Sequence, residues 1–386
     1  MKILYHHRIA SKDGQYVHIE ELIKSFRLLG HELVIVEPEQ LTKKSFGKSS
    51  GSVQNLRTFL PAFLHEFIEF SYSFYDFYKI TAAIIKHKPD CIYERYNLFF
   101  ISGILAKKLF SLPLVLEINA PLFQERDKNH GIQLRTLAKW TETYVWKNAD
   151  YLLPVTAVLA DMVVAGGAVK EKCLVIPNGI NTESFSDKHD GKKIRNALGL
   201  QDKIVLGFVG FVRDWHRLDR VLTTLHKHSE KNWHLLLVGD GPAREALELQ
   251  AAELGITDHV SFVGVVDRHE VPDYVSAFDI ALQPDVVEYA SPLKLFEYLY
   301  LGRAVLAPKR KNILEILVDG ENALLFDPAD EAAFATQLER LCLSAELRAV
   351  LGRAARNTIA VKQLYWDENA RKVERIFKQL LENKHA

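Results

Sequence analysis

Short apolar runs alternate with longer helical patterns along this chain of 386 residues, and this alternation constrains the fold more than any other feature. The runs KILY and ELVIV flank a segment in which Val17, Leu22, Phe26 and Leu29 fall roughly on one helical stripe. Gly30 is placed to end that helix. The runs DCIYE, LPLVLEI and ADYLLPV follow, separated by further helical patterns. This order predicts a parallel sheet with helices on both faces.

The same alternation restarts after a polar stretch near residue 185. IVLGFVG, HLLLVG, HVSFVG, DIALQP and RAVLAP are the predicted strands of this second part. The last segment, WDENARKVERIFKQLLENKHA, is predicted to be a charged amphipathic helix. The sequence therefore predicts an α/β protein with two doubly wound domains, which fits the length of the chain.

Composition excludes several classes of protein. Lysine plus arginine equals aspartate plus glutamate at 49 each, so no net charge directs the chain toward nucleic acid. The three cysteines, Cys91, Cys173 and Cys342, are far apart, which predicts a reducing compartment and no disulfide framework. The N-terminus does not read as a signal peptide, and no apolar run approaches 18 residues. We expect a cytoplasmic protein, at most peripheral at the inner face of a membrane.

Loops that follow strands are the places to search for a ligand site, because open α/β sheets bind ligands beyond the carboxyl ends of their strands. Gly14 precedes the first helix and Gly239 opens the loop GDGP before another, so either could bring backbone N–H groups to an anion or form an ordinary turn. Neither loop has the dinucleotide fingerprint or the Lys-Ser/Thr of a P-loop. Arg213 and His216 follow another strand and could hold a diphosphate or form a solvated surface cluster.

The stretch EYASPLKLFEYLYLGRAVLAP is the most informative, because it reads as a loop, a helix and a buried strand. Ser291 is the predicted N-cap of the helix. Lys294 then falls in the first turn, where a cation is unfavourable beside the positive end of the helix dipole unless an anion lies nearby. Glu297 is three residues later on the same face, and it could accept hydrogen bonds from two ribose hydroxyls or form a salt bridge with Lys294.

Taken in order, the motifs DGQYVHIEEL, GHELVIV, PNGIN, GFVGFVRDWHRLD, LLLVGDGP, VSFVGVV and SPLKLFEYLYLGRAVLAP resemble the retaining glycosyltransferases of family 4, over nearly the whole chain. The resemblance implies the GT-B fold, with two Rossmann-like domains facing each other across a cleft. Residues 186–360 would bind a nucleotide-diphosphate sugar, and residues 1–185 would bind the acceptor. The last helix, within 361–386, would cross back to the first domain. The absence of an Asp-x-Asp motif disfavours the metal-dependent type, so we expect no metal and no other cofactor.

The resemblance also implies roles in the second domain. Glu297 matches the family glutamate that contacts the ribose, whereas the family's first glutamate falls on Tyr289, with Glu288 one position away. This departure leaves the contact to the donor sugar unassigned. The donor-binding residues predicted in this way are Gly14, Arg213, His216, Gly239, Val263, Gly264, Val265, Glu288, Tyr289, Ala290, Ser291, Pro292, Leu293, Lys294 and Glu297.

The diphosphate contacts depart from the family pattern as well. The family's lysine falls on His216 and its arginine on Phe211, and Arg213 is close enough in sequence to substitute. We therefore expect Arg213, His216 and Lys294 to hold the diphosphate. If His216 does so as a cation, donor binding should weaken as the pH rises past its pKa.

In the first domain, the family histidine near the donor sugar falls close to Asn119, with Glu117 beside it. Glu117 could be a carboxylate of the cleft or simply the end of a strand. Arg95 and Tyr96 follow another strand and, with Gln15, are predicted to lie on the acceptor side. The residues predicted to act in catalysis are Asn119, Glu117, Arg213 and Lys294.

Acceptor and setting stay open at the level of sequence. The acceptor could be a saccharide, a lipid-linked compound or a small molecule, with cell-envelope polysaccharide or glycolipid assembly as the default. An aromatic stripe over residues 59–78 could be core packing, or it could contact a lipid-linked acceptor or the membrane surface. The two adjacent histidines, His6 and His7, are expected at the surface. Alternatives are a natural-product glycosyltransferase, a sugar-nucleotide 2-epimerase and a non-catalytic subunit that binds a sugar nucleotide.

Overall fold

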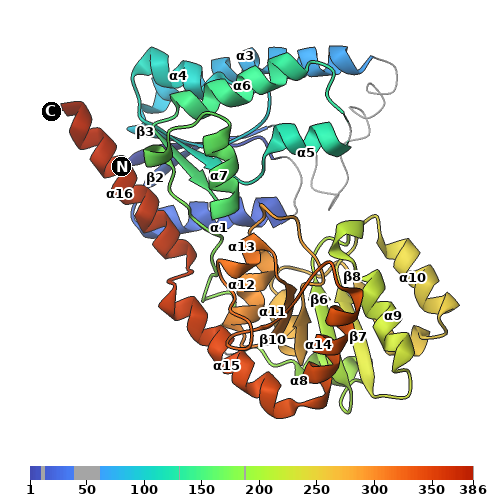
Figure 1. Cartoon of the computed structure of the whole chain (residues 1–386). Coiled ribbons are helices and arrows are strands. Elements are labelled where there is room, and N and C mark those ends of the chain that lie inside the picture. Colours follow the sequence, from blue (N-terminus) through green and yellow to red (C-terminus); the bar gives the residue numbers. More distant parts are fainter. Residues whose placement is uncertain (10–13, 39–60, 130, 187, 386) are drawn as a thin grey trace. The chain divides into compact units, whose positions relative to one another are not determined.

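The computed structural model describes residues 1–9, 14–38, 61–129, 131–186 and 188–385. The chain divides into two compact units (Figure 1). Unit 1 comprises Met1–Pro177 and Trp366–Ala386, and unit 2 comprises Asn178–Tyr365. Each unit holds one parallel sheet, and the GT-B fold predicted from the sequence is confirmed.

Unit 1 contains a five-stranded parallel sheet with the strand order β2-β1-β3-β4-β5. Its strands are β1 (Lys2–His6), β2 (Glu32–Val36), β3 (Cys91–Arg95), β4 (Leu114–Ile118) and β5 (Tyr151–Pro154). Its helices are α1 (Gly14–Leu28), α3 (Ala62–His87), α4 (Ser102–Phe110), α5 (Leu122–Asn129), α6 (Arg135–Asn148), α7 (Ala157–Ala165), the 3₁₀ turn η1 (Lys170–Lys172) and α16 (Trp366–His385).

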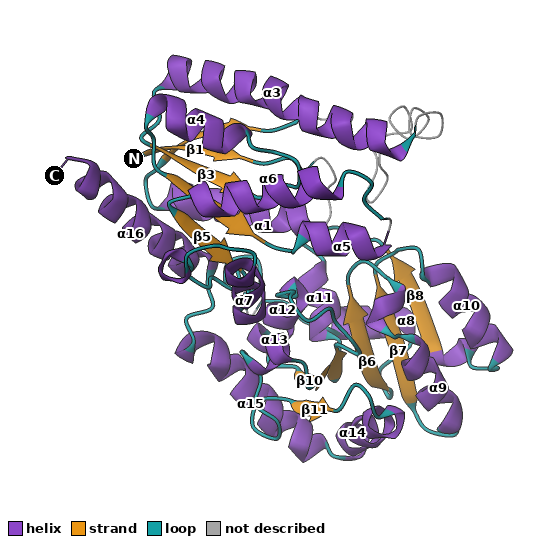
Figure 2. Cartoon of the chain, turned by 45° about the horizontal axis from the view of Figure 1, so that its top comes forward, coloured by secondary structure: helices purple, strands orange, loops and turns teal. Residues whose placement is uncertain are grey.

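The two faces of this sheet are covered by different helices (Figures 1 and 2). On one face, α1 and α16 form a core with the strands, in which Phe26 and Phe377 are fully buried. Ser25 on α1 donates a hydrogen bond of 2.8 Å to Asp367 on α16. The last helix therefore returns to the N-terminal unit, as predicted. On the other face, α3 and α4 lie side by side.

Two expectations fail in unit 1. His6 and His7 are buried, because β1 is a central strand and its carboxyl end lies under α3 and α1. The interpretation of the aromatic stripe as core packing is wrong for Phe63, Phe67 and Phe74, whose rings are exposed on α3. The first residues of that stripe, 59 and 60, lie outside the described residues.

Unit 2 contains a six-stranded parallel sheet with the strand order β11-β10-β9-β6-β7-β8. Its strands are β6 (Ile204–Val209), β7 (Trp233–Val238), β8 (Val260–Gly264), β9 (Ile280–Leu282), β10 (Ala304–Pro308) and β11 (Leu324–Phe326). Its helices are α8 (Lys192–Leu198), η2 (Asp214–His216), α9 (Asp219–Lys227), α10 (Arg244–Glu253), η3 (Thr257–His259), α11 (Val271–Ser276), α12 (Leu293–Tyr300), α13 (Lys311–Leu314), α14 (Glu331–Leu343) and α15 (Ala345–Val361). The edge strand β11 was not among the strands predicted from the sequence.

The chain enters unit 2 earlier than residue 185. Ile180 and Phe185 are both buried in the core of unit 2, and the N–H of Ile180 donates to the carbonyl of Leu364 at 3.0 Å. The segment before residue 185 is thus part of the second core, and the boundary lies between Pro177 and Asn178.

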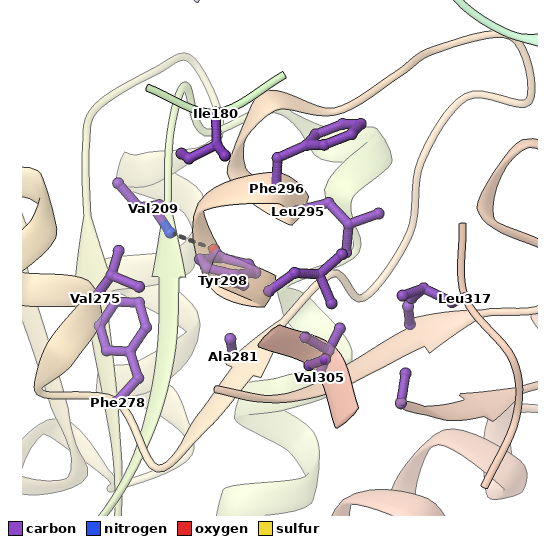
Figure 3. Close-up of a cluster of buried hydrophobic side chains, with 14 of the residues drawn as sticks. Ile180, Val209, Val275, Phe278, Ala281, Leu295, Phe296, Tyr298, Val305 and Leu317 are labelled. Carbon is purple, nitrogen blue, oxygen red and sulfur yellow. Dashed lines mark hydrogen bonds between the residues drawn. The ribbon is translucent and has the colours of Figure 1, made fainter. Parts of the chain in front are cut away.

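Tyr298 fixes the position of α12 in this core (Figure 3). Its ring is fully buried, and its hydroxyl accepts a hydrogen bond of 3.0 Å from the N–H of Val209, the last residue of β6. Residues 294 and 298 are one helical turn apart, so this bond also sets where Lys294 lies relative to the end of β6.

None of the described helices is long and apolar enough to cross a membrane.

Replacing Tyr298 by phenylalanine should destabilise unit 2 by about 1–3 kcal/mol, because the buried N–H of Val209 then lacks an acceptor. Urea unfolding measures the effect, with Tyr78→Phe at an exposed tyrosine as the matched control. An unfolding free energy equal to that of the control would contradict this role for the hydroxyl.

Candidate functional site

Two glycine-containing loops meet at the carboxyl ends of β6 and β7. Gly210 and Gly239 both have φ near +130°, a backbone conformation that favours glycine. A Cβ on Gly239 would lie 2.0 Å from the carbonyl oxygen of Gly210, and one on Gly241 would lie 2.2 Å from that of Val212. The N–H of Gly239 donates to the carbonyl of Gly264 at 2.7 Å, which joins the end of β8 to the same place. Only glycine permits this close approach of three strand ends.

Lys294 lies against these loops from the first turn of α12. Its Nζ is 3.8 Å from the centroid of the Phe208 ring and 3.5 Å from Nε2 of His216. A Cβ on Gly210 would be 3.1 Å from the same Nζ. Burial lowers the pKa of Lys294 from 10.5 to about 7, although the charge of Glu297 opposes this. Within the described ranges, no carboxylate lies at ion-pair distance from Lys294.

Glu297 pairs with Arg268 instead. Its carboxylate is buried, and Oε1 lies 2.6 Å from Nη1 of Arg268, so the alternative of a salt bridge to Lys294 is wrong. The guanidinium of Arg268 also lies over the ring of Phe185, 5.1 Å from its centroid. Arg268 was not predicted from the sequence, because it stands in a loop after β8 and belongs to no motif.

His216 is neutral in this arrangement. Burial, followed by the charges of Lys294 and Arg213, lowers the pKa of His216 to about 2. Nδ1 accepts from the backbone N–H of Arg213 at 3.3 Å, and Nε2 lies 3.5 Å from Nζ of Lys294. The low pKa of His216 gives no support to the expected pH dependence through a charged ring, whereas the pKa of Lys294, at about 7, places its titration near neutral pH.

Arg213 is exposed, and its guanidinium stacks over two aromatic rings. It lies 4.6 Å from the ring centroids of both Phe211 and Trp215. These contacts hold the cation at the loop that follows β6. The structure thus brings Arg213, His216 and Lys294 together, as the sequence predicted.

Ser291, the residue predicted to be the N-cap of α12, does not occupy that position. Helix α12 begins at Leu293 with Pro292 at the N-cap, and no side chain caps it. The hydroxyl of Ser291 instead accepts from the N–H of Asn178 at 3.1 Å, and Asn178 Nδ2 donates to the carbonyl of Ser291 at 2.6 Å. Asn178, which belongs to the PNG motif, therefore positions the loop before α12.

The loop that contains Glu288, Tyr289 and Ala290 is held in place by Asn312. Asn312 Nδ2 donates to the carbonyl of Ala290 at 2.6 Å and to that of Val287 at 3.1 Å. Glu288 is exposed, and its carboxylate accepts from Arg310 at 3.3 Å. Tyr289 is half-buried. At the end of β8, Val263 is half-buried, Gly264 has φ +84° and Val265 is exposed.

In unit 1, Glu117 is a buried carboxylate surrounded by donors. It accepts from Tyr93 at 2.7 Å, from Arg95 at 2.5 Å and from Asn119, and His18 Nε2 lies 3.0 Å away. Burial raises the pKa of Glu117, but His18, Arg95 and the hydrogen bonds outweigh burial and hold the pKa far below its usual range. Glu117 is thus a buried anion whose oxygens are engaged by Tyr93, Arg95 and Asn119.

The other residues predicted for unit 1 are placed differently. Arg95 is buried, and Tyr96 is buried with its hydroxyl donating to Glu142 at 2.8 Å. The side chain of Tyr96 therefore points into the interior of unit 1 and does not reach the surface where an acceptor substrate was predicted to bind. Gly14 begins α1 and is exposed, whereas the side chain of Gln15 lies outside the described residues.

One group of side chains in unit 2 has the composition of a metal site. Among the described residues, Asp267, His269 and Glu270 have ligand atoms within 4.8 Å of one another, and all three side chains are exposed. Exposed acidic groups often lie this close without an ion, so proximity alone does not make this group a metal site.

Solved structures share this fold over almost the full length. HepE from Anabaena, in complex with UDP-glucose, matches with a TM-score of 0.77 and 17% identity, covering 98% of this chain and 100% of that chain. Sucrose-phosphate synthase from Thermosynechococcus elongatus matches with a TM-score of 0.76 and 18% identity, covering 99% and 100%. At such identities the likeness establishes the GT-B fold alone.

Family models match both parts of the chain. The model for Glycosyltransferase Family 4 matches residues 12–184, and the model for Glycosyl transferases group 1 matches residues 190–358. The chain belongs to the GT-B glycosyltransferases.

Curated relatives of this GT-B glycosyltransferase are distant. Sulfoquinovosyl transferase of Arabidopsis thaliana is 24% identical over 353 residues, which cover 89% of this chain and 66% of that protein. The 2-deoxystreptamine glucosyltransferase of Streptomyces kanamyceticus is 25% identical over 264 residues, which cover 64% of this chain and 67% of that protein. The chain thus spans about two-thirds of the length of these relatives.

Proposed function

We propose that this GT-B glycosyltransferase transfers a sugar from a nucleotide-diphosphate sugar to an acceptor hydroxyl with retention of configuration. The observation that carries the proposal is the ammonium of Lys294, which is partly buried beside two glycine loops without a carboxylate partner in the described part of unit 2. A cation in this setting is costly unless an anion binds to it. The diphosphate of a donor would supply that anion.

The neighbouring groups suit the remaining parts of a donor. Arg213 would add a second cation to the diphosphate, and His216 would donate Nε2–H as a neutral ring. Glu297 would accept the ribose hydroxyls once Arg268 turns away, since Arg268 occupies one of its oxygens. The backbone at Val263–Val265 would contact the base. Gly239 would let the backbone approach the phosphates.

The carboxylates of the candidate site are all engaged: Glu117 by its donors, Glu288 by Arg310 and Glu297 by Arg268. A retaining double displacement needs a nucleophile and an acid close together, and Glu117 is locked by its donors. We infer front-face substitution, in which the acceptor oxygen bonds to the anomeric carbon as the bond to the diphosphate breaks. The departing phosphate oxygen takes the acceptor's proton. Lys294 and Arg213 would stabilise the negative charge that develops on the diphosphate.

The proposal extends to the nucleotide of the donor and to the place where the acceptor binds. HepE is described in complexes with UDP and UDP-glucose, which favours a uridine donor here. We keep cell-envelope polysaccharide or glycolipid assembly as the setting and place acceptor binding in unit 1, near Asn119 and Arg95. A 2-epimerase would release a rearranged sugar without an acceptor. A non-catalytic subunit would bind the donor without turnover.

Affinity for UDP-glucose should fall as the pH rises through 7. Lys294 is charged below its pKa of about 7 and neutral above it, and only the charged amine attracts the diphosphate. Binding that takes up one proton weakens by up to about tenfold per pH unit. Isothermal titration calorimetry between pH 6 and 9 measures this. Lys294→Met should bind weakly at every pH, and the control His216→Asn should keep the slope. A slope that vanishes in His216→Asn would contradict the assignment to Lys294.

Transfer should need no metal ion and should retain the anomeric configuration. The sequence has no Asp-x-Asp motif, and Lys294 and Arg213 would balance the diphosphate charge in place of a cation. NMR of the product reports its anomer, and an assay in EDTA reports the metal requirement. An inverted product, or activity lost in EDTA and restored by Mg²⁺, would refute the respective claim.

A further inference from the structure

Helix α3 turns polar residues inward. Ser73 accepts from the N–H of Ile101 at 3.0 Å, and Glu66 accepts from the N–H of Leu134 at 2.6 Å. Asp76 lies 2.7 Å from Nε2 of His6, which is itself fully enclosed. All three α3 side chains are buried. These bonds fix the rotation of the helix about its axis.

An exposed side of α3, turned away from these hydrogen bonds, is aromatic. Phe63, Phe67, Phe74 and Tyr78 have exposed fractions of 48%, 54%, 51% and 67%. Their spacing of three or four residues, completed by Phe70, places them on one stripe. A soluble helix normally has the reverse arrangement, with its apolar stripe toward the core. A contiguous exposed stripe of this kind marks an interaction site.

The stripe continues onto α6, which lies beside α3 (Figure 2). The ring of Phe70 is 5.6 Å from that of Phe74 and 6.4 Å from that of Trp140. Trp140 stacks on Tyr144 at 5.4 Å. We call this set the aromatic surface; its members are Phe63, Phe67, Phe70, Phe74, Tyr78, Trp140 and Tyr144.

The charges around the aromatic surface are positive. The acidic residues of α3, α4 and α6 are turned inward or paired: Glu66, Asp76 and Glu142 are buried, and Glu69 pairs with Arg126 at 2.7 Å. Lys108 on α4 lies over the ring of Tyr144, 4.9 Å from its centroid. The exposed basic residues of the three helices are Lys86, Lys108, Arg135, Lys139 and Lys147, of which Arg135 pairs with Asp127 on α5.

We propose that the aromatic surface docks flat on an anionic phospholipid membrane. Phenylalanine, tryptophan and tyrosine favour the boundary between headgroups and acyl chains, and lysines beside them are attracted to anionic lipid. A second copy of the chain fits less well, because an isologous contact would bring the same lysines of both copies together. The proposal concerns a surface of unit 1 and does not depend on the donor site in unit 2.

Vesicle co-sedimentation tests the proposal with the full chain. Vesicles of phosphatidylcholine with phosphatidylglycerol should bind the wild type, and vesicles of phosphatidylcholine alone should bind it at least about tenfold more weakly. The triple variant Phe63→Ser, Phe67→Ser, Phe74→Ser should lose at least about tenfold in partitioning to the anionic vesicles. The double variant Lys108→Glu, Lys147→Glu should lose the preference for anionic lipid.

A matched control removes exposed apolar side chains elsewhere, with Leu249→Ser, Leu343→Ser and Val361→Ser on unit 2. It should bind like the wild type, and thermal melting should show that both triple variants are folded. Equal vesicle binding by the Phe variant and the control would overturn the proposal. So would a wild type that binds no anionic vesicle, or one that forms dimers which only the Phe variant disrupts.

Discussion

The close passage of the Gly239 backbone over the carbonyl of Gly210 is the contact on which unit 2 depends. It leaves no room for a side chain between the backbones that follow β6 and β7, so a ligand there would meet backbone groups and the side chain of Lys294. Tyr298 then ties α12 to the last residue of β6. The partly buried ammonium of Lys294 is a consequence of that tie.

Unit 1 depends instead on buried carboxylates that are paired with donors and with a histidine in its interior. Glu117 collects hydrogen bonds from three side chains at the end of β4. At the end of β1, His6 lies 2.7 Å from both Asp76 and Glu94; burial opposes its charge, but these two carboxylates raise the pKa of His6 to about 9. The second cluster anchors α3 through its polar side. It therefore explains both the burial of His6 and the outward direction of the aromatic rings.

Much of the fold could be predicted from the sequence, because apolar runs of parallel strands are buried on both faces and stand out from helical patterns. The anomaly of a lysine in the first turn of α12 also pointed to Lys294. Partners in space could not be predicted: Glu297 pairs with Arg268 from a separate loop, and Ser291 accepts from Asn178 instead of capping α12. The aromatic stripe on α3 was interpreted as core packing, but its rings are exposed. Helical periodicity shows that residues share a face without showing which way that face points.

The central claim is that the loops of unit 2 and the first turn of α12 hold a nucleotide-diphosphate sugar. Thermal-shift measurements with UDP, GDP, ADP, CMP and dTDP sugars test it most directly, comparing the wild type with Glu297→Ala and with Glu321→Ala at an exposed turn. We expect one nucleotide to stabilise the wild type and the Glu321→Ala variant, and we expect this shift to be lost in Glu297→Ala. Stabilisation by none of them, or a shift that survives in Glu297→Ala, would contradict it.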